Sequence, residues 1–447
     1  MGVVNARRVF ALLAGVTAVL LGLVVAVGTG RDGRQDLAAS APVPTGAQET
    51  PGIEEEPVVP AAAEEWVGAW SAAPAGSEPG TRDGLPDQTI RNVVRASVGG
   101  SSTRVELSNR YGTRPVTFTH VTVALAESGG PAARPGSMRD VTFGEFTSVT
   151  IPAGGSVVSD PVDLPVTAGA DLLVTVYAPD PSGPVTYHHI ALEPVYVARG
   201  DVADATSGTG FKQDGESWRY VTGVHVLSQD TDGAVVVLGD PLTDGLDSPP
   251  GANRRWTDIL ARRLRQTPDA PALAVLNQGI SGNRLLSDAL PGHESRGVSG
   301  LRRLPTDVLA QPGVRTVVIQ LGVNDIVGQP RQTDPDAIVA GLRTLAEQAR
   351  AEGLHVVGAT LAPFGGHSAY SEELERIRQQ VNAAIRAGGV FDAVADFDAA
   401  LRDPAVPQRM LPLYDSGDGL HPNDAGYEAM ARAVDLGALL GGAERTL

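Results

Sequence analysis

The chain contains no cysteine, and this absence excludes disulfides, thiolate nucleophiles, zinc–thiolate sites and iron–sulfur clusters. It does not locate the protein, because an exported protein need not carry disulfides. Basic residues are also scarce relative to acidic ones: 35 Lys and Arg stand against 52 Asp and Glu, for a formal net charge of −17. This balance argues against nucleic acid or an anionic membrane surface as the main partner.

The length and composition indicate several structural units. A chain of 447 residues is too long for one ordinary domain, and its hydrophobic content of 42% is enough to build real cores. The 53 glycines and 33 prolines indicate many turns and at least one linker. We therefore expect two or three units.

The N-terminus indicates export. An uncharged apolar run over residues 9–28 follows Arg7 and Arg8, and it is about long enough to span a bilayer as a helix. An uncleaved signal anchor is favoured over a cleaved signal peptide, whose possible cleavage site, "AASA" at 38–41, lies well past the run. Residues 1–28 are thus a signal peptide or signal anchor, and they are the expected membrane contact. We expect an extracellular or cell-surface protein.

Two regions of different character follow this segment. Residues 29–64 are rich in Ala, Pro and Glu without a sustained period, which predicts a disordered linker. Residues 65–230 show short alternating runs broken by Gly, Pro and Asn, which predict an antiparallel β domain, either a sandwich or a jelly roll. Within it, "NVVRASVGGSSTRVELSN" at 92–109 predicts a hairpin with "GGSS" as its turn. His188 and His189 occupy neighbouring strand positions, so we expect them on opposite faces, as structural or surface residues rather than a metal pair.

From residue 231 to 447 strands alternate with helices. The alternation predicts right-handed crossovers and a three-layer α/β/α domain around a five-stranded parallel sheet. Ligands in such folds gather at the carboxyl ends of the strands. The predicted strands are "AVVVLG", "LAVLN", "RTVVIQLG", "LHVVGATL" and "FDAVADF".

Three short motifs follow these strands or precede the last helix. In "DSGDGLHPND", Asp418 stands three residues before His421, so the carboxylate can hold one imidazole nitrogen while the other faces a pocket. The amide of Asn324, after the third strand, can donate to a developing oxyanion. Gly282, after the second strand, can offer a bare backbone N–H. Each motif has a plain alternative: a surface turn before a capped helix, an Asn–Asp turn, and an ordinary loop glycine.

Taken in order with "VVVLGDPLTDGLDS" at 235–248, these motifs resemble the blocks of the SGNH or GDSL family of serine esterases and lipases. The family's first block reads Gly-Asp-Ser, followed by a Thr-Asp-Gly-like turn. The resemblance covers roughly residues 232–440, and "WVGAW", "NRRW" and "DSGDGLHPNDAGY" make the chain similar to a secreted actinobacterial branch that carries a β-rich region before the catalytic domain. The matching positions are Gly239, Asp240, Pro241, Thr243, Asp244, Gly245, Gly282, Asn324, Asp418 and His421.

The resemblance implies a cofactor-free mechanism. A serine attacks an ester carbonyl, with His421 in the place of the general base and Asp418 in that of its orienting acid. The serine N–H, the Gly282 N–H and the Asn324 amide would form the oxyanion hole. The departure falls on the nucleophile, because Pro241 stands where the family has serine.

Proline at 241 removes a hydroxyl and a backbone N–H together. In serine proteases the loss of the nucleophile costs about six orders of magnitude in turnover, and the loss of one oxyanion donor about two to three. The fold tolerates the change, since proline suits the first turn of a helix and an extended residue before it. Asp240, Thr243 and Ser248 are weak replacements, because the first two occupy ordinary family positions and the third lies well along the loop. A calcium loop is excluded, since Leu242 falls where a ligand oxygen is needed.

We therefore expect an exported ester hydrolase of this family, acting on small-molecule or carbohydrate esters, whose chemistry is lost or severely impaired at Pro241. The alternative is a non-catalytic cell-surface protein that binds a glycan or ester with Gly282, Asn324 and His421. A third reading makes Pro241 a recent lesion or a sequence error, since proline and serine codons differ by a single base. The sequence indicates neither the acyl and alcohol groups of a substrate nor an oligomeric state.

Overall fold

The computed structural model describes residues 64–441. The predicted signal segment at 1–28 lies outside the described residues, as does the predicted linker except for Glu64. Over the described range, none of the helices has the length and apolar character needed to cross a bilayer.

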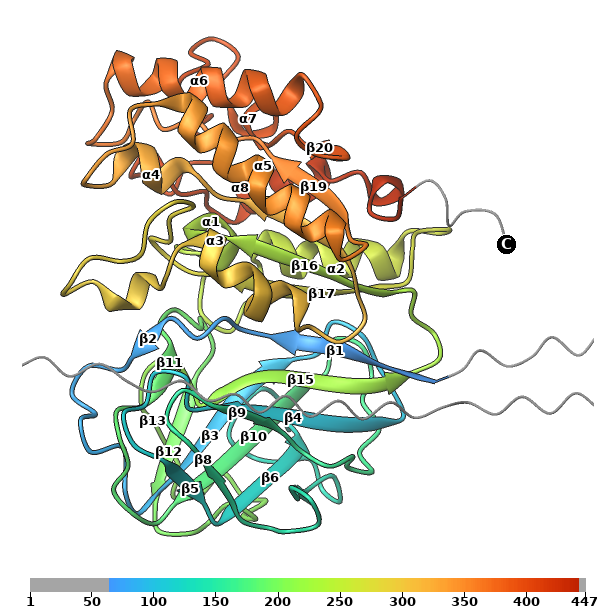
Figure 1. Ribbon diagram of the computed structural model, residues 1–447. Helices are drawn as coiled ribbons and strands as arrows, with labels where there is room; N and C mark the ends of the chain where they lie inside the picture. The colour runs from blue at the N-terminus through green and yellow to red at the C-terminus, as the bar shows by residue number, and fades with distance from the viewer. Residues whose placement is uncertain (1–63, 442–447) are drawn as a thin grey trace, which may run out of the picture. The chain divides into compact units, whose positions relative to one another are not determined.

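The first part of the described chain, Glu65–Ser228, is built from antiparallel sheets, and we call it the β-rich region (Figure 1). Its strands pair in a six-stranded sheet of order β13-β12-β3-β10-β6-β7 and a four-stranded sheet of order β1-β15-β4-β9. Smaller sheets join β14-β11-β2 and β5-β8. The strands are β1 Glu65–Ser71, β2 Gly76–Ser77, β3 Gln88–Arg95, β4 Ser102–Ser108, β5 Val116–Phe118, β6 His120–Leu125, β7 Arg139–Asp140, β8 Val149–Ile151, β9 Ser156–Val158, β10 Asp171–Ala178, β11 Thr186–His188, β12 Val195–Arg199, β13 Lys212–Gln213, β14 Trp218–Arg219 and β15 Val221–Ser228.

The hairpin predicted at 92–109 is wrong. Both strands form, but β3 pairs with β10 and β12 while β4 pairs with β15 and β9, so they lie in different sheets. The glycines between them serve close packing instead of a turn. A Cβ on Gly99 would lie 2.6 Å from the Val166 oxygen, and one on Gly100 would lie 2.4 Å from the Leu227 oxygen. Glycine there allows the chain to cross between sheets in contact with neighbouring backbone.

The five-stranded parallel sheet is confirmed in the second part, residues 233–441, which we call the α/β region. Its order is β17-β16-β18-β19-β20, and every neighbouring pair is parallel. All seven residues of β16 are buried, as expected for a central strand covered on both faces. The strands are β16 Gly233–Gly239, β17 Leu273–Gly279, β18 Val314–Gln320, β19 His355–Ala359 and β20 Ala393–Ala395.

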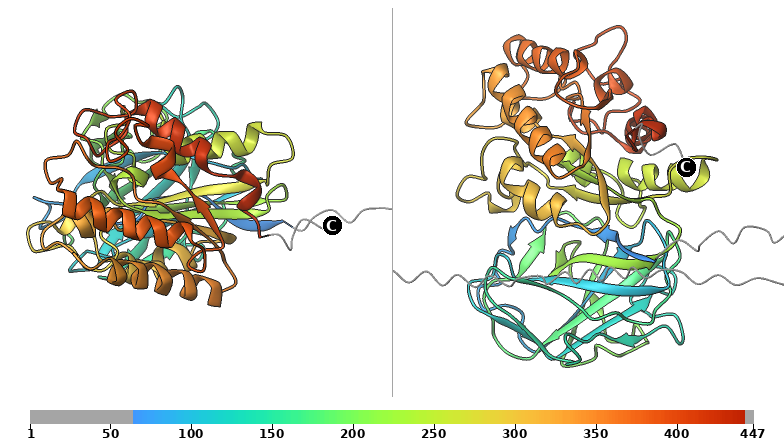
Figure 2. Two further views of the ribbon diagram at one scale, coloured as in Figure 1. Left: turned by 90° about the horizontal axis from the view of Figure 1, so that it is seen from above. Right: turned by 45° about the vertical axis from the view of Figure 1, so that its right-hand side comes forward.

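Helices cover both faces of this sheet, and Figure 2 shows them on its two sides. Val236 and Leu238 of β16 face the cluster that holds α5 and α6, whereas Val235 and Val237 face the cluster that holds α2 and α8. The alternation of strand side chains therefore builds the three layers. The helices are α1 Pro241–Asp244, α2 Trp256–Gln266, α3 Gly300–Arg303, α4 Val323–Val327, α5 Pro335–Ala351, α6 Glu372–Arg386, α7 Phe397–Leu401 and α8 Asp424–Ala433. Short 3-10 helices form at Glu294–Arg296 and Leu436–Ala438, and a π-helical stretch forms at Leu304–Leu309.

The β-rich region and the α/β region share a hydrophobic core. One continuous cluster contains Val105 and Val226 from the first and Val236 and Leu276 from the second. Strand β1 packs closely on β17, since a Cβ on Gly68 would lie 2.6 Å from Leu276 Cδ1. This packing brings side chains of the β-rich region within reach of the loops that follow β16 and β17. The predicted boundary between residues 230 and 231 stays a prediction.

Candidate active site

Three of the candidate site residues follow the carboxyl ends of three adjacent strands of the sheet. Gly239 at the end of β16 is in register with Gly279 of β17 and with Gln320 of β18, so the three strands end level. Pro241, Gly282 and Asn324 each come within a few residues of these ends. Parallel α/β sheets bind ligands at the carboxyl ends of their strands.

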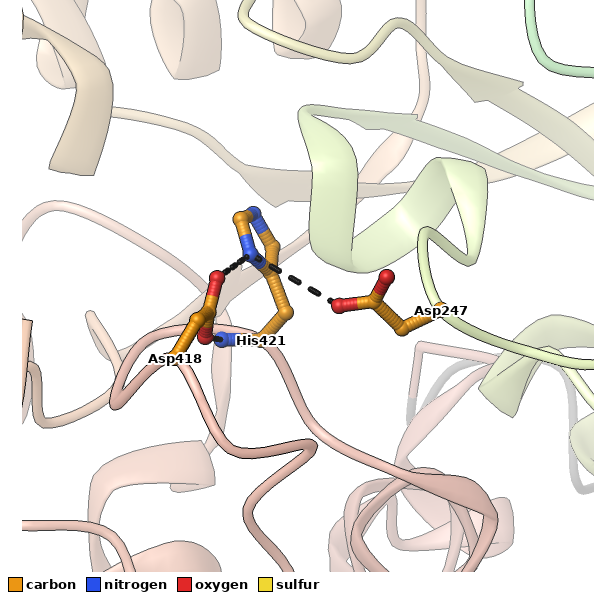
Figure 3. A group of neighbouring side chains, drawn as sticks. All are labelled: Asp247, Asp418 and His421. Carbon is orange, nitrogen blue, oxygen red and sulfur yellow. Dashed lines mark hydrogen bonds and ion pairs between the residues drawn. The ribbon is translucent and has the colours of Figure 1, made fainter.

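Asp418 and His421 form the predicted pair, which Figure 3 shows. Asp418 Oδ2 lies 2.5 Å from His421 Nδ1, and Oδ1 accepts backbone N–H bonds from Leu420 at 2.9 Å and His421 at 2.8 Å. Burial alone would raise the pKa of Asp418, but the hydrogen bonds from His421 and Leu420 outweigh it and lower that pKa. The carboxylate therefore stays ionised and orients the ring. In Figure 3 the other ring nitrogen points away from Asp418, which is the arrangement that a general base needs.

A second carboxylate, which the sequence analysis missed, lies beside this pair. Asp247 Oδ2 is 4.0 Å from His421 Nδ1 and accepts a hydrogen bond from Ser416 Oγ at 3.0 Å. Asp247 adopts a left-handed backbone conformation, with φ +72°, just after α1. The Tyr427 hydroxyl also donates to the Leu246 oxygen at 2.5 Å. These contacts fasten the histidine loop to the turn that follows Pro241.

Asp247, Asp418 and His421 are also the group of described residues that could hold a cation, since one ligand atom from each lies within 4.8 Å of the others. Both carboxylates face Nδ1, and Asp418 is already hydrogen-bonded to it. The geometry is that of a hydrogen-bonded pair with a neighbouring acid.

Pro241 occupies the first position of α1, as the sequence predicts. Asp240 caps the helix, with its Oδ1 accepting the Leu242 N–H at 3.1 Å, and its backbone is extended at φ −115° and ψ −157°. The replacement nucleophiles considered above are inaccessible. Asp240 and Thr243 are fully buried and Ser248 is 4% exposed, and the Thr243 hydroxyl donates to Gln320 Oε1 at 2.8 Å. The turn after β16 therefore begins a helix at Pro241, and none of these three side chains is exposed beside it.

Asp240 makes the stability of the folded protein depend on pH. Burial raises its pKa to about 7, the charges of Asp325 and Asp244 add to this, and the Leu242 N–H opposes it. A carboxyl whose pKa is raised on folding stabilises the folded state below its unfolded pKa, and this contribution is lost as the pH rises through about 7. The shift from an ordinary value near 3.8 corresponds to roughly 4 kcal/mol.

We therefore expect Asp240→Asn to gain stability relative to the parent chain, by roughly 4 kcal/mol, as the pH rises from 4 to 8. Asparagine keeps a cap for Leu242 and does not titrate. Denaturant unfolding of both chains across that range measures the difference. Burial raises the pKa of Glu193 to about 7 as well, but Glu193 is common to both chains and cancels. Parallel pH curves would show that Asp240 is ionised in the folded protein.

The two oxyanion candidates lie on connected loops. Asn324 Nδ2 donates to the Asn283 oxygen at 3.0 Å, which leaves its second amide hydrogen for a ligand. Gly282 has φ +78°, a conformation that favours glycine. Asp325 accepts the backbone N–H groups of Leu285 at 2.8 Å and Leu286 at 3.0 Å, which fixes the loop after Gly282.

Arg303, which sequence analysis did not identify, lies beneath these loops and is 1% exposed. Its guanidinium donates to the Gly239 oxygen at 3.2 Å, to Asn283 Oδ1 at 2.8 Å and to the Gln278 oxygen. It also pairs with buried Asp307 at 2.7 Å. One side chain thus links the ends of β16 and β17 to the loop that carries Gly282.

The sheet, the turn after β16 and the histidine loop define a three-layer α/β/α domain with a candidate site at the carboxyl ends of its strands, and comparison with known proteins shows which family this domain matches. Residues 237–429 match the model of the GDSL-like lipase/acylhydrolase family. This segment, which makes up most of the α/β region, therefore carries a domain of the SGNH/GDSL family. It is 26% identical over 207 residues to a GDSL lipase of Mycobacterium tuberculosis, a match that covers 45% of this chain and 79% of that protein.

Two solved structures resemble part of the chain. A putative lipolytic protein of the G-D-S-L family from Desulfitobacterium hafniense is 20% identical, with a TM-score of 0.34, and the match covers 45% of this chain and 99% of the other. A carbohydrate acetylesterase family member from Sinorhizobium meliloti is 19% identical, with a TM-score of 0.36, over 45% of this chain and 94% of the other.

Proposed function

We propose that this protein is an exported SGNH/GDSL acylhydrolase whose serine-dependent ester cleavage is lost at Pro241. The observation that carries the proposal is the position of Pro241 itself: it begins α1 directly after β16, where the family has its nucleophile, in a site that keeps the Asp418–His421 pair. The apolar run at residues 9–28 supports the export.

The remaining groups define what the site can do. His421, oriented by Asp418, can accept a proton, while Asn324 and Gly282 can donate to a carbonyl oxygen. Pro241 offers neither a hydroxyl to acylate nor the N–H that would complete the oxyanion hole. A carbonyl ligand can thus be bound and polarised, but no acyl-enzyme forms at this position. The matching family model is that of lipases and acylhydrolases, and the curated relative is described as a lipase, which supports an ester as the ligand; we propose a small-molecule or carbohydrate ester.

A fluorophosphonate probe tests the loss of the nucleophile, because it reacts with activated serines. We expect the full chain to remain unlabelled and Pro241→Ser to be labelled in a stoichiometric amount at residue 241, as read by intact-protein and peptide mass spectrometry. The double variant Pro241→Ser with His421→Ala, which lacks the base, should lose the label and serves as the control. Labelling of the parent chain at Ser248 or Thr243 would contradict the proposal.

A second function, ester or glycan binding without cleavage, is favoured by one observation: the Asp418–His421 pair is formed and hydrogen bonds hold the loops of Asn324 and Gly282, although proline stands at 241. The parent full chain is tested by calorimetry against acetylated and deacetylated xylo-oligosaccharides. Binding that requires the acetyl group and is lost in Asn324→Ala would support a binding role for this site. Equal heats for both sugars, or none, would argue against it.

A further inference from the structure

His188 comes from the β-rich region but contacts the turn that follows Pro241. It lies at the end of β11 and is 5% exposed, whereas its neighbour His189 is exposed. The two histidines therefore have the different environments that their strand positions predict. Nε2 of His188 lies 2.9 Å from Asp244 Oδ1, and both residues are buried. A histidine of one region is thus paired with an acid of the other.

The surroundings of His188 indicate an imidazolium. Nδ1 faces the Ala73 oxygen at 2.8 Å, and Nε2 faces the Ile190 oxygen at 3.2 Å as well as Asp244. Each ring nitrogen thus faces oxygen acceptors, and only the protonated ring has an N–H on both. Burial alone would lower the pKa of His188, but the charge and hydrogen bond of Asp244 outweigh it and raise that pKa. The Arg255 guanidinium, which opposes this rise, donates to the Asp244 backbone oxygen at 3.1 Å.

Asp244 also bonds to the loop that carries Gly282. Its second oxygen, Oδ2, accepts the Ser281 N–H at 2.8 Å and the Ser281 hydroxyl at 2.6 Å. Ser281 directly precedes Gly282, whose N–H is an oxyanion donor in the proposed site. Hydrogen bonds that a carboxylate accepts are among the stronger ones in proteins. Three contacts therefore connect a side chain of the β-rich region to the loop that carries Gly282.

We propose that His188 is a positioning residue of the hydrolase site: its imidazolium neutralises and orients Asp244, which in turn holds Ser281 and so sets the direction of the Gly282 N–H. This inference rests on the proposed assignment of Gly282 to the oxyanion hole. It gives the β-rich region a role in the site in addition to sharing its core. Without His188, Asp244 would remain a buried carboxylate that lacks its charged partner.

The first test needs no activity. Hydrogen–deuterium exchange of peptides covering 279–285 is measured in the full-length protein, which keeps Pro241, and in three single variants of it. The variants are His188→Leu, His188→Gln and His189→Leu. We expect about tenfold faster exchange in His188→Leu, since a bond to a charged group is lost. His188→Gln keeps one N–H donor and should retain most of the protection, and His189→Leu should match the parent.

Strand β19, residues 355–359, is the internal control for folding, and its exchange should stay unchanged in all variants. If His188→Leu fails to fold, Asp244→Asn gives the same test with an almost isosteric change, because a neutral amide oxygen accepts the Ser281 bonds more weakly than a carboxylate does. Unchanged exchange at 279–285 in a folded His188→Leu or Asp244→Asn chain would overturn the coupling. An equal rise in β19 would also overturn it, since the effect would then be global.

The second test uses the Pro241→Ser chain. There His188→Leu should lower kcat about tenfold with little change in KM, because the oxyanion donor acts on the transition state, and His188→Gln should restore most of kcat. An active Pro241→Ser chain whose kcat is indifferent to His188→Leu would overturn the inference and leave the proposed function standing. An inert but folded Pro241→Ser chain would count against the proposed function, and the exchange experiment would still decide the coupling.

Discussion

Pro241→Ser should raise the turnover of an activated acetate ester by about six orders of magnitude over the parent chain, in line with the cost of losing the nucleophile in serine proteases. Serine at this position would restore both the attacking hydroxyl and the backbone N–H of the oxyanion hole. The turn should accept the change, because Asp240 still caps α1 through Leu242 and the first helical position needs no intrahelical N–H donor. The measurement is the steady-state hydrolysis of p-nitrophenyl acetate by full-length parent and variant chains.

The double variant Pro241→Ser with His421→Ala is the matched control, and it should return close to the parent rate. Two results would contradict the prediction in different ways. Parent turnover equal to that of Pro241→Ser, and abolished by His421→Ala, would show that another group attacks the ester. A folded Pro241→Ser chain without activity would show that the site has lost more than its nucleophile. Full recovery would also fit the reading of Pro241 as a recent lesion.

Arg303→Leu should lower the free energy of unfolding by about 3–5 kcal/mol, the range seen when one partner of a buried ion pair is removed. The variant leaves Asp307, at 4% exposure, without its closer cation. Arg110 remains at 3.2 Å from the same carboxylate, so Asp307 keeps one cationic partner and the loss should not exceed this range. The backbone oxygens of Gly239 and Gln278 would also lose a donor. Urea unfolding of the full chain measures the change.

Arg302→Leu is the neighbouring control, because Arg302 is largely exposed and pairs with Asp288 at the surface. Exposed pairs contribute about 0.2–1 kcal/mol, so this variant should stay within about 1 kcal/mol of the parent. Equal effects of the two variants would show that Arg303 is not a structural link under the nucleophile turn. A loss of unfolding free energy confined to Arg303→Leu would confirm that Arg303 stabilises the strand ends that carry the site.

Local sequence pattern was sufficient for the parallel sheet and for the pair at the histidine loop. Apolar runs separated by helical stretches place β16 to β20, because strands and helices differ in period and length. Asp418 and His421 are three residues apart, so a single turn brings them together. Pro241 could likewise be assigned to a helix start, since proline has a strong preference there.

The hairpin at 92–109 shows where local reasoning fails. Two alternating strands joined by a glycine-rich segment are equally compatible with a hairpin and with a connection between two different sheets. The choice depended on Val166 and Leu227, whose backbone oxygens crowd Gly99 and Gly100 and lie far away in the sequence. No spacing rule contains these partners.

The sequence by itself determined the resemblance to the family, the α/β layer order and the place of Pro241 at a helix start, because short ordered motifs and local periodicity carry each of these. The tertiary structure alone decided that Asp247 lies beside His421, that Arg303 supports the strand ends and that His188 reaches Asp244. These three contacts join segments far apart in the chain, or residues with no required spacing. The His188–Asp244 contact exists because the shared core packs β1 against β17. The other two form within the α/β region, where the parallel sheet brings separate loops to the same strand ends.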